Sequence, residues 1–130
     1  KTRANWWEIP PGIPGLETTA PLLLTEVAKG TISLKRVVEA LAESPARIFG
    51  INRGELREGA AADIILVDMK RRFKIDSSTF FSKAKYSPFD GRKVTGKVVK
   101  TFVGGKLAYD EGRIVGEPGM GSIIYPRTVD

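Results

Sequence analysis

Hydrophobic residues recur with a helical period in the first quarter of the chain. Five of them fall at i, i+4, i+7, i+8 and i+11, one face of a helix with about 3.6 residues per turn: Leu16, Ala20, Leu23, Leu24 and Val27. We predict a helix that ends at Gly30, with Thr18 or Thr19 accepting a free backbone amide at its start. Pro21 is compatible with the first turn, where its missing amide is not needed.

A second stretch with the same spacing follows Ser33, which we predict to cap a helix running to about Glu43. Ser44-Pro45 then predicts a new start, with Ser as the cap and Pro at the first helical position. This third helix should end at Gly50. The pattern therefore predicts three short helices in series.

From about Glu58 the pattern changes to strands. Residues 63–69, DIILVDM, form a continuous β-branched and aliphatic run, which predicts a strand buried on both faces. We expect RRFKI, residues 71–75, to be its partner strand. Residues 77–91 show little periodicity and contain turn signals.

Gly104-Gly105 separates two strand-like runs, 97–103 and 106–110, and both glycines can take the positive φ angles that a tight hairpin requires. Glu111-Gly112 predicts another turn before a short last strand. Helices followed by strands indicate two structural regions, which we expect to meet near residues 52–56.

The composition of the 130 residues excludes several kinds of catalytic and metal site. No apolar run approaches the roughly 18 residues that would span a bilayer, and the chain contains neither Cys nor His. A Ser/His or Cys/His nucleophile is therefore impossible within this chain, and a zinc site inside it would have to rely on carboxylates. Because the absence of Cys fits a reducing compartment, we expect a cytoplasmic protein.

The formal net charge is +6, but Lys and Arg are scattered among Asp and Glu along the whole length. Three basic clusters and three aromatic residues could together bind nucleic acid: residues 70–72, 83–85 and 92–93 with Phe80, Phe81 and Tyr86. We favour solvated cations and aromatic side chains that fill the space under a loop. Nucleic acid is therefore a disfavoured partner.

Two further motifs have simple structural interpretations. GRKVTGK, residues 91–97, imitates a phosphate loop, but Val98 stands where Ser or Thr would hold magnesium, and the residues that follow favour a strand over a helix. The adjacent indoles Trp6-Trp7 could form a binding patch, yet we expect them to anchor the proline-rich loop that follows. No complete active site is present in the sequence.

Four stretches, taken in order, resemble the C-terminal portion of the dihydroorotases, a family of metal-dependent cyclic amidohydrolases: GIPGLETTAPLLL, SPARIFGI, GELREGAAADIILVDM and SKAKYSPFDGRKVTGKVVKTFVGGKLAYDEG. The third stretch alone would indicate only the wider amidohydrolase superfamily, because hydantoinases and allantoinases carry similar segments. The pairing of FFSKAKYSPFDG with GKVVKTFVGGKLAYDEG favours dihydroorotase.

The resemblance implies an α/β parent in which a (β/α)8 TIM-type barrel is joined to a composite β-sandwich. Residues 1–52 would supply the substrate-side loop and the last helices of the barrel. Residues 53–130 would supply the C-terminal strands of the small β-sandwich domain and a surface tail.

The resemblance also implies the chemistry. In the family, two zinc ions make a hydroxide nucleophilic, which opens the cyclic amide of dihydroorotate, and the reverse reaction closes N-carbamoyl-aspartate. The metal ligands and catalytic residues are expected outside these 130 residues, so the isolated segment should be inactive. One substrate contact transfers: the main chain of Pro11 and Gly12 matches a segment that hydrogen-bonds the pyrimidine ring. Neighbouring prolines would lower the entropy cost of holding that backbone.

The leading hypothesis is thus a piece of dihydroorotase, acting in pyrimidine biosynthesis on a small pyrimidine precursor. Another cyclic amidohydrolase (allantoinase or hydantoinase) and a non-catalytic binding or scaffold module remain open, as does a loop that merely starts a barrel helix. We expect the rest of the barrel, or another chain in an oligomer, to cover the apolar faces of the first two helices and an unpaired sheet edge. No membrane contact is expected.

Overall fold

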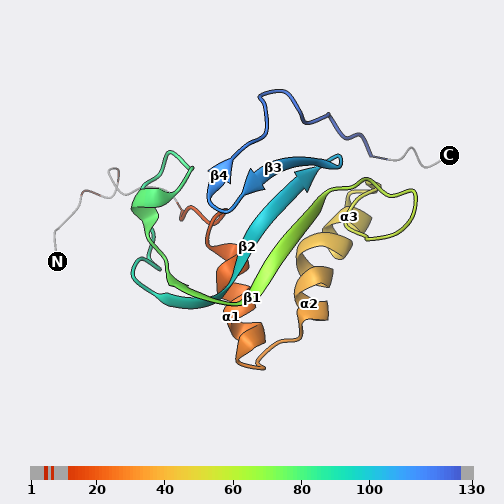
Figure 1. Cartoon of the computed structure of the whole chain (residues 1–130). Coiled ribbons are helices and arrows are strands. Elements are labelled where there is room, and N and C mark those ends of the chain that lie inside the picture. The colour runs from red at the N-terminus through yellow and green to blue at the C-terminus, as the bar shows by residue number, and fades with distance from the viewer. Residues whose placement is uncertain (1–4, 6, 8–11, 127–130) are drawn as a thin grey trace.

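The computed structural model describes residues 5, 7 and 12–126. Its centre is an antiparallel sheet with strand order β1-β2-β3-β4. The strands are β1 (Ile64–Lys74), β2 (Lys93–Val103), β3 (Lys106–Asp110) and β4 (Arg113–Ile114). The helices are α1 (Thr19–Ala28), α2 (Leu34–Val38), the π-helix η2 (Glu39–Glu43), α3 (Ser44–Ile48) and the 3-10 helix η3 (Ser77–Thr79). Helix α1 crosses the sheet on one side and packs on β2, and α2 packs against α1 (Figure 1).

Helix α1 confirms the first predicted helix and its end. Gly30 has a φ of +77° and donates to the Val27 carbonyl at 2.9 Å, while Thr31 donates to the Glu26 carbonyl at 3.0 Å. This pair of bonds is the glycine-terminated Schellman motif. The predicted extension of the apolar face to Leu16 is wrong, because this residue precedes the helix and its side chain is 89% exposed.

The predicted threonine cap of α1 is also wrong. Thr18 occupies the cap position without a side-chain cap bond. Instead, the Thr19 hydroxyl donates to the Gly15 carbonyl at 2.7 Å, and the Thr18 hydroxyl donates to the same oxygen at 3.4 Å. The threonines therefore bind the preceding loop to the helix rather than satisfying a free amide.

Helices α2, η2 and α3 run without a break. The predicted third helix is confirmed as α3, with Pro45 in its first turn, whereas the predicted cap at Ser44 is wrong. Ser44 has helical φ and ψ angles of −67° and −45°. Because Pro45 has no amide to donate, the helix accommodates it with the wider turn of η2. The predicted cap at Ser33 is confirmed, since its side chain accepts from the Arg36 amide at 3.1 Å. Gly50, with a φ of +61°, follows the end of α3 as predicted.

Strand β1 joins two segments that the sequence predicts as partners. Residues 71–75 continue residues 63–69 instead of pairing with them, and β1 pairs along its length with β2. A bulge lies between Asp68 and Arg72, and the Asp68 side chain accepts from the Lys70 and Arg71 amides at 2.9 and 3.1 Å within it. An aspartate-stabilised bulge thus joins the two predicted strands into one.

The two glycine turns of the sheet are confirmed. Gly104 and Gly105 have φ angles of +54° and +80° between β2 and β3, and Glu111 and Gly112 have φ angles of +43° and +96° between β3 and β4. Asp63 links this end of the sheet to the helical region, because its carboxylate accepts from the Gly104 amide at 2.7 Å and lies 2.6 Å from the Arg53 guanidinium.

Helix α1 packs closely on β2 at Gly96. This glycine has a φ of +93°, and a Cβ there would lie 2.6 Å from the Leu24 Cβ. At the neighbouring positions of both elements, the buried Thr25 hydroxyl accepts from the Thr95 amide at 2.9 Å. The core beside this joint consists of Ile75, Phe80 and Val94, against which Leu22, Phe73 and Phe89 pack. The middle of α1 is thereby fixed against the sheet.

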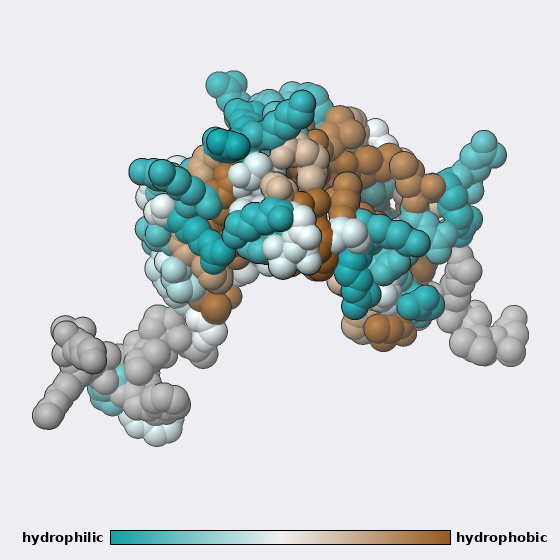
Figure 2. Space-filling model, turned by 90° about the horizontal axis from the view of Figure 1, so that it is seen from below, coloured by the Kyte–Doolittle hydropathy of each residue, from teal (hydrophilic) through white to brown (hydrophobic). Residues whose placement is uncertain are grey.

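Many large hydrophobic side chains remain at the surface. In Figure 2 brown hydrophobic atoms reach the outside between teal hydrophilic ones. On the helices, Leu34, Val38, Leu41 and Ile48 are each at least 41% exposed, and we refer to these four residues together as the stripe. The prediction of a strand buried on both faces is wrong for β1, where Ile65 and Leu66 are 54% and 46% exposed. Helix α1 differs from the expectation of an exposed apolar face, because Leu24 is buried on β2.

Among the described helices, none has the length and apolar character needed to cross a bilayer.

Candidate functional site

The loop that enters α1 carries the predicted substrate contact. Pro11 lies outside the described residues, whereas Gly12 is described and exposed, with a φ of +78°. Apart from its chain neighbours, no atom of the described residues lies within 4 Å of the place where a Gly12 Cβ would stand. A ligand could approach this backbone closely, which is a common use of glycine. The role of Pro11 and Gly12 in binding substrate stays a prediction.

The Gly15 carbonyl ties the loop to the start of α1 through hydrogen bonds. The Gly15 oxygen accepts from the backbone amides of Thr18 and Thr19 at 3.1 and 2.9 Å, in addition to the two threonine hydroxyls. Because α1 is itself fixed on β2, the loop has a firm base.

Glu17 connects this loop to a distant part of the chain. Its carboxylate accepts from the Ser82 amide at 2.8 Å and from the Ser82 hydroxyl at 2.8 and 3.0 Å. Partial burial by itself raises the pKa of the Glu17 carboxyl, but hydrogen bonds, led by those from Ser82, outweigh burial and lower that pKa below its ordinary value of 4.5. The carboxylate form is therefore the one that the structure favours.

Tyr86 reaches the tip of the same loop. Its hydroxyl donates to the Gly12 carbonyl in a long hydrogen bond of 3.4 Å. Phe89, from the same segment, lines an apolar hollow of about 330 Å³ together with residues 13–15 and the start of α1. The sequence placed Tyr86 among candidate base-stacking residues, and nothing in the local pattern indicated a partner 74 residues away.

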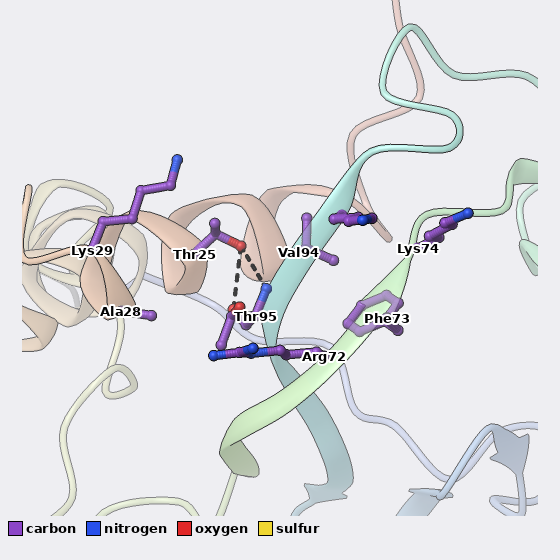
Figure 3. Close-up of a pocket in the computed structure, with 9 residues that line it drawn as sticks. Thr25, Ala28, Lys29, Arg72, Phe73, Lys74, Val94 and Thr95 are labelled. Atoms are coloured by element: carbon purple, nitrogen blue, oxygen red, sulfur yellow. Dashed lines mark hydrogen bonds between the residues drawn. The ribbon is translucent and has the colours of Figure 1, made fainter.

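A second, basic hollow lies at the other end of α1 (Figure 3). It measures about 530 Å³ and is lined by Thr25, Ala28, Lys29, Arg72, Phe73, Lys74, Lys93, Val94 and Thr95. The hydrogen bonds between Thr25 and Thr95 close its wall, and Lys29 is paired with Glu26 at 2.8 Å. None of the described residues that line it carries a carboxylate, so its charged groups are all basic.

The structure favours the structural interpretation of the basic and aromatic residues. Phe80 is 7% exposed and belongs to the core, so its ring is not available for base stacking. Arg71 is paired with Glu111 at 2.6 Å, and the Lys85 ammonium donates to the Phe80 carbonyl. GRKVTGK enters strand β2 instead of opening a helix, which contradicts a phosphate loop.

Within residues 5, 7 and 12–126, no three His, Cys, Asp or Glu side chains are grouped so that they could hold a metal ion. The described residues therefore do not fit the zinc that the resemblance implies. That zinc ligands lie elsewhere in a longer enzyme stays a prediction.

Comparison with known proteins identifies the family. The family model described as "Amidohydrolase family" matches residues 9–108 of the chain. This chain belongs to the amidohydrolase family. The predicted similarity to dihydroorotases is confirmed: the dihydroorotase of Methanothermobacter thermautotrophicus is 45% identical over 114 residues, which are 87% of this chain and 26% of that protein.

This amidohydrolase chain is also similar to hydantoinases. The L-hydantoinase of Paenarthrobacter aurescens is 42% identical over 127 residues, 95% of this chain and 28% of that protein. A solved structure of L-hydantoinase (dihydropyrimidinase) from Arthrobacter aurescens superposes with a TM-score of 0.87 at 43% identity, over 92% of this chain and 27% of that one. The chain thus spans roughly a quarter of the length of the relatives that it matches.

Proposed function

We propose that this chain is part of a dihydroorotase, the zinc-dependent cyclic amide hydrolase that interconverts dihydroorotate and N-carbamoyl-aspartate in pyrimidine biosynthesis. The observation that carries the proposal is the 45% identity to a dihydroorotase along 87% of the chain. The chain contributes the Pro11-Gly12 loop, whose main chain hydrogen-bonds the ring, and structural support. Alone it is inactive, and its enzyme acts in the cytoplasm.

The proposed architecture assigns residues 1–52 to the substrate-side loop and last helices of a (β/α)8 barrel, and residues 53–130 to a composite β-sandwich. The exposed stripe at Leu34, Val38, Leu41 and Ile48 supports a covering partner for the helices. Strand β1 is at the edge of the sheet and has exposed apolar residues, which supports further strands beside it. The rest of the enzyme, or another subunit of an oligomer, supplies both.

In this enzyme, the chain's own residues bind the ring substrate and orient it. Gly12 lets a flat ring approach the backbone, because no side chain stands between them. The firm base of the loop at Gly15 lowers the ordering cost of binding. The zinc-bound step belongs to residues outside this chain.

A hydantoinase is the second candidate, favoured by the TM-score of 0.87 and the coverage of 92% in the L-hydantoinase comparison. Both enzymes open a cyclic amide, so the loop would have the same task with a different ring.

The substrate decides between the two candidates. We would assay the intact zinc-loaded enzyme with dihydroorotate, N-carbamoyl-aspartate, hydantoin and allantoin at equal concentrations. The proposal expects kcat/KM for dihydroorotate to exceed that for hydantoin and allantoin by about a hundredfold, because matched polar groups discriminate strongly between rings. Preference for hydantoin or allantoin would replace it with that cyclic amidohydrolase, and no turnover of any ring would favour a scaffold.

A further inference from the structure

The segment between β1 and β2, residues 76–91, is held in place by its own hydrogen bonds and by a buried side chain. Asp76 caps η3 by accepting from the Ser78 amide at 3.0 Å, and Asp90 accepts from the Ser77 amide at 2.7 Å. Phe80 is buried in the core. The segment is therefore held at both ends and in its middle, and it can act as a rigid support.

This support touches the loop entering α1 at three places. Ser82 donates two kinds of hydrogen bond to Glu17, Tyr86 donates to Gly12, and Phe89 lines the hollow behind residues 13–15. The partners are 65 and 74 residues apart in sequence, so the contacts arise only in the folded chain. Figure 1 places the segment and the entrance to α1 on the same side of the sheet.

We propose that Ser82 and Tyr86 are positioning residues for the Gly12 loop, holding it in the conformation that receives a cyclic amide. Ser82 fixes the base of the loop through Glu17, and Tyr86 orients its tip through the Gly12 carbonyl. Neither side chain has to touch the substrate. The inference rests on the proposed function, because it assigns these residues to the loop that is proposed to bind the ring.

The contacts of Ser82 and Tyr86 raise the population of the loop conformation that can bind the ring. If the binding-competent conformation is only partly populated, the apparent affinity falls by that fraction, while the saturated enzyme still holds the loop in place. Removing a positioning contact should therefore raise KM and leave kcat nearly unchanged. Ser82 should matter more than Tyr86, because charge-assisted bonds of 2.8 Å are stronger than a neutral bond of 3.4 Å.

The test uses the intact enzyme with the variants Ser82→Ala and Tyr86→Phe. The matched controls are Ser122→Ala and Tyr125→Phe, whose residues are exposed on the C-terminal segment. Hydrogen exchange of the amides in residues 12–18 is measured without substrate, and kcat and KM are measured with the best ring substrate. Ser82→Thr, which keeps a hydroxyl, serves as the conservative rescue.

We expect faster exchange in residues 12–18 for both variants, with KM raised about three- to tenfold and kcat within about twofold. The controls and Ser82→Thr should remain close to the unmodified enzyme. Unchanged exchange in both variants would overturn the inference, and so would faster exchange with an unchanged KM. An enzyme that turns over no cyclic amide would overturn the proposed function, while the exchange measurement would still decide whether these residues hold the loop.

Discussion

At the scale of single residues, the Glu17–Ser82 contact has a defined dependence on pH. Hydrogen bonds from Ser82 keep the pKa of Glu17 below 4.5 in the folded chain. A carboxyl with a depressed folded-state pKa contributes stability that is fully present above the unfolded value and is lost as pH falls through the folded one. The free energy of unfolding should therefore lose this contribution only in acid, below about pH 4.5.

Glu17→Gln tests this dependence. The variant should be less stable than the unmodified protein by an amount that is constant from about pH 5 to 7 and shrinks below pH 4.5. Urea unfolding at a series of pH values measures it. In the Ser82→Ala background, the loss of stability caused by Glu17→Gln should depend less on pH. The hydrogen bonds from the Ser82 hydroxyl, which help to lower the Glu17 pKa, are absent there. A difference independent of pH down to pH 3 would be inconsistent with the assigned contact.

At the scale of elements, the contact of α1 with β2 depends on the missing side chain at Gly96. A Cβ there meets the Leu24 Cβ at 2.6 Å, and the φ of +93° is unfavourable for any other residue. Gly96→Ala should cost about 1–2 kcal/mol for the backbone angle and roughly a further 1–3 kcal/mol for overpacking. Gly91→Ala, with a φ of +74° and nothing within 4 Å, should show only the backbone cost.

Chemical denaturation of the two alanine variants measures these costs. Leu24→Gly should cost less in the Gly96→Ala background than alone, because it removes the Leu24 Cβ that the added atom would meet. Equal destabilisation by the two glycine substitutions would mean that α1 does not pack closely on Gly96.

The elements also show what the sequence could predict. Local signals gave the Schellman end at Gly30, the Ser33 cap and the Gly104-Gly105 hairpin, since each depends on a few neighbouring residues. The cap predicted at Ser44 failed because η2 continues directly into α3, so Ser44 has helical backbone angles. The strand at residues 71–75 was separated from its predecessor because an Asp68 bulge resembles a break.

The candidate site was predictable only in part, for a similar reason. The Pro11-Gly12 loop stood out through its glycines and prolines and through the family resemblance. Its support from Ser82 and Tyr86 could not be predicted, because the periodicity of a loop says nothing about partners 65 or more residues away.

At the scale of the whole molecule, the exposed apolar stripe on α2, η2 and α3 predicts different behaviour for the separate chain and the intact enzyme. Leu41 and Ile48, 49% and 77% exposed, are its test residues. The separately expressed chain should self-associate, and Leu41→Gln with Ile48→Gln should reduce this because apolar patches drive association. In the intact enzyme the same pair should lower stability by about 2–5 kcal/mol, since the proposed partner covers the stripe there.

Sedimentation velocity and thermal unfolding measure the two effects. Leu56→Gln with Ile123→Gln, at residues 87% and 79% exposed outside the stripe, is the control pair. A monomeric chain, together with an intact enzyme indifferent to the stripe substitutions, would contradict the proposed covering partner.

The central claim is that this chain supplies a backbone loop against which a cyclic amide binds, and Gly12→Ala in the intact enzyme tests it most directly. Gly119→Ala is the matched control, because both glycines have a positive φ (+78° and +83°) with nothing within 4 Å of the added Cβ. Both should lose about 1–2 kcal/mol of stability, but only Gly12→Ala should lower kcat/KM on dihydroorotate, by tenfold or more. Wild-type kcat/KM in Gly12→Ala would contradict the claim.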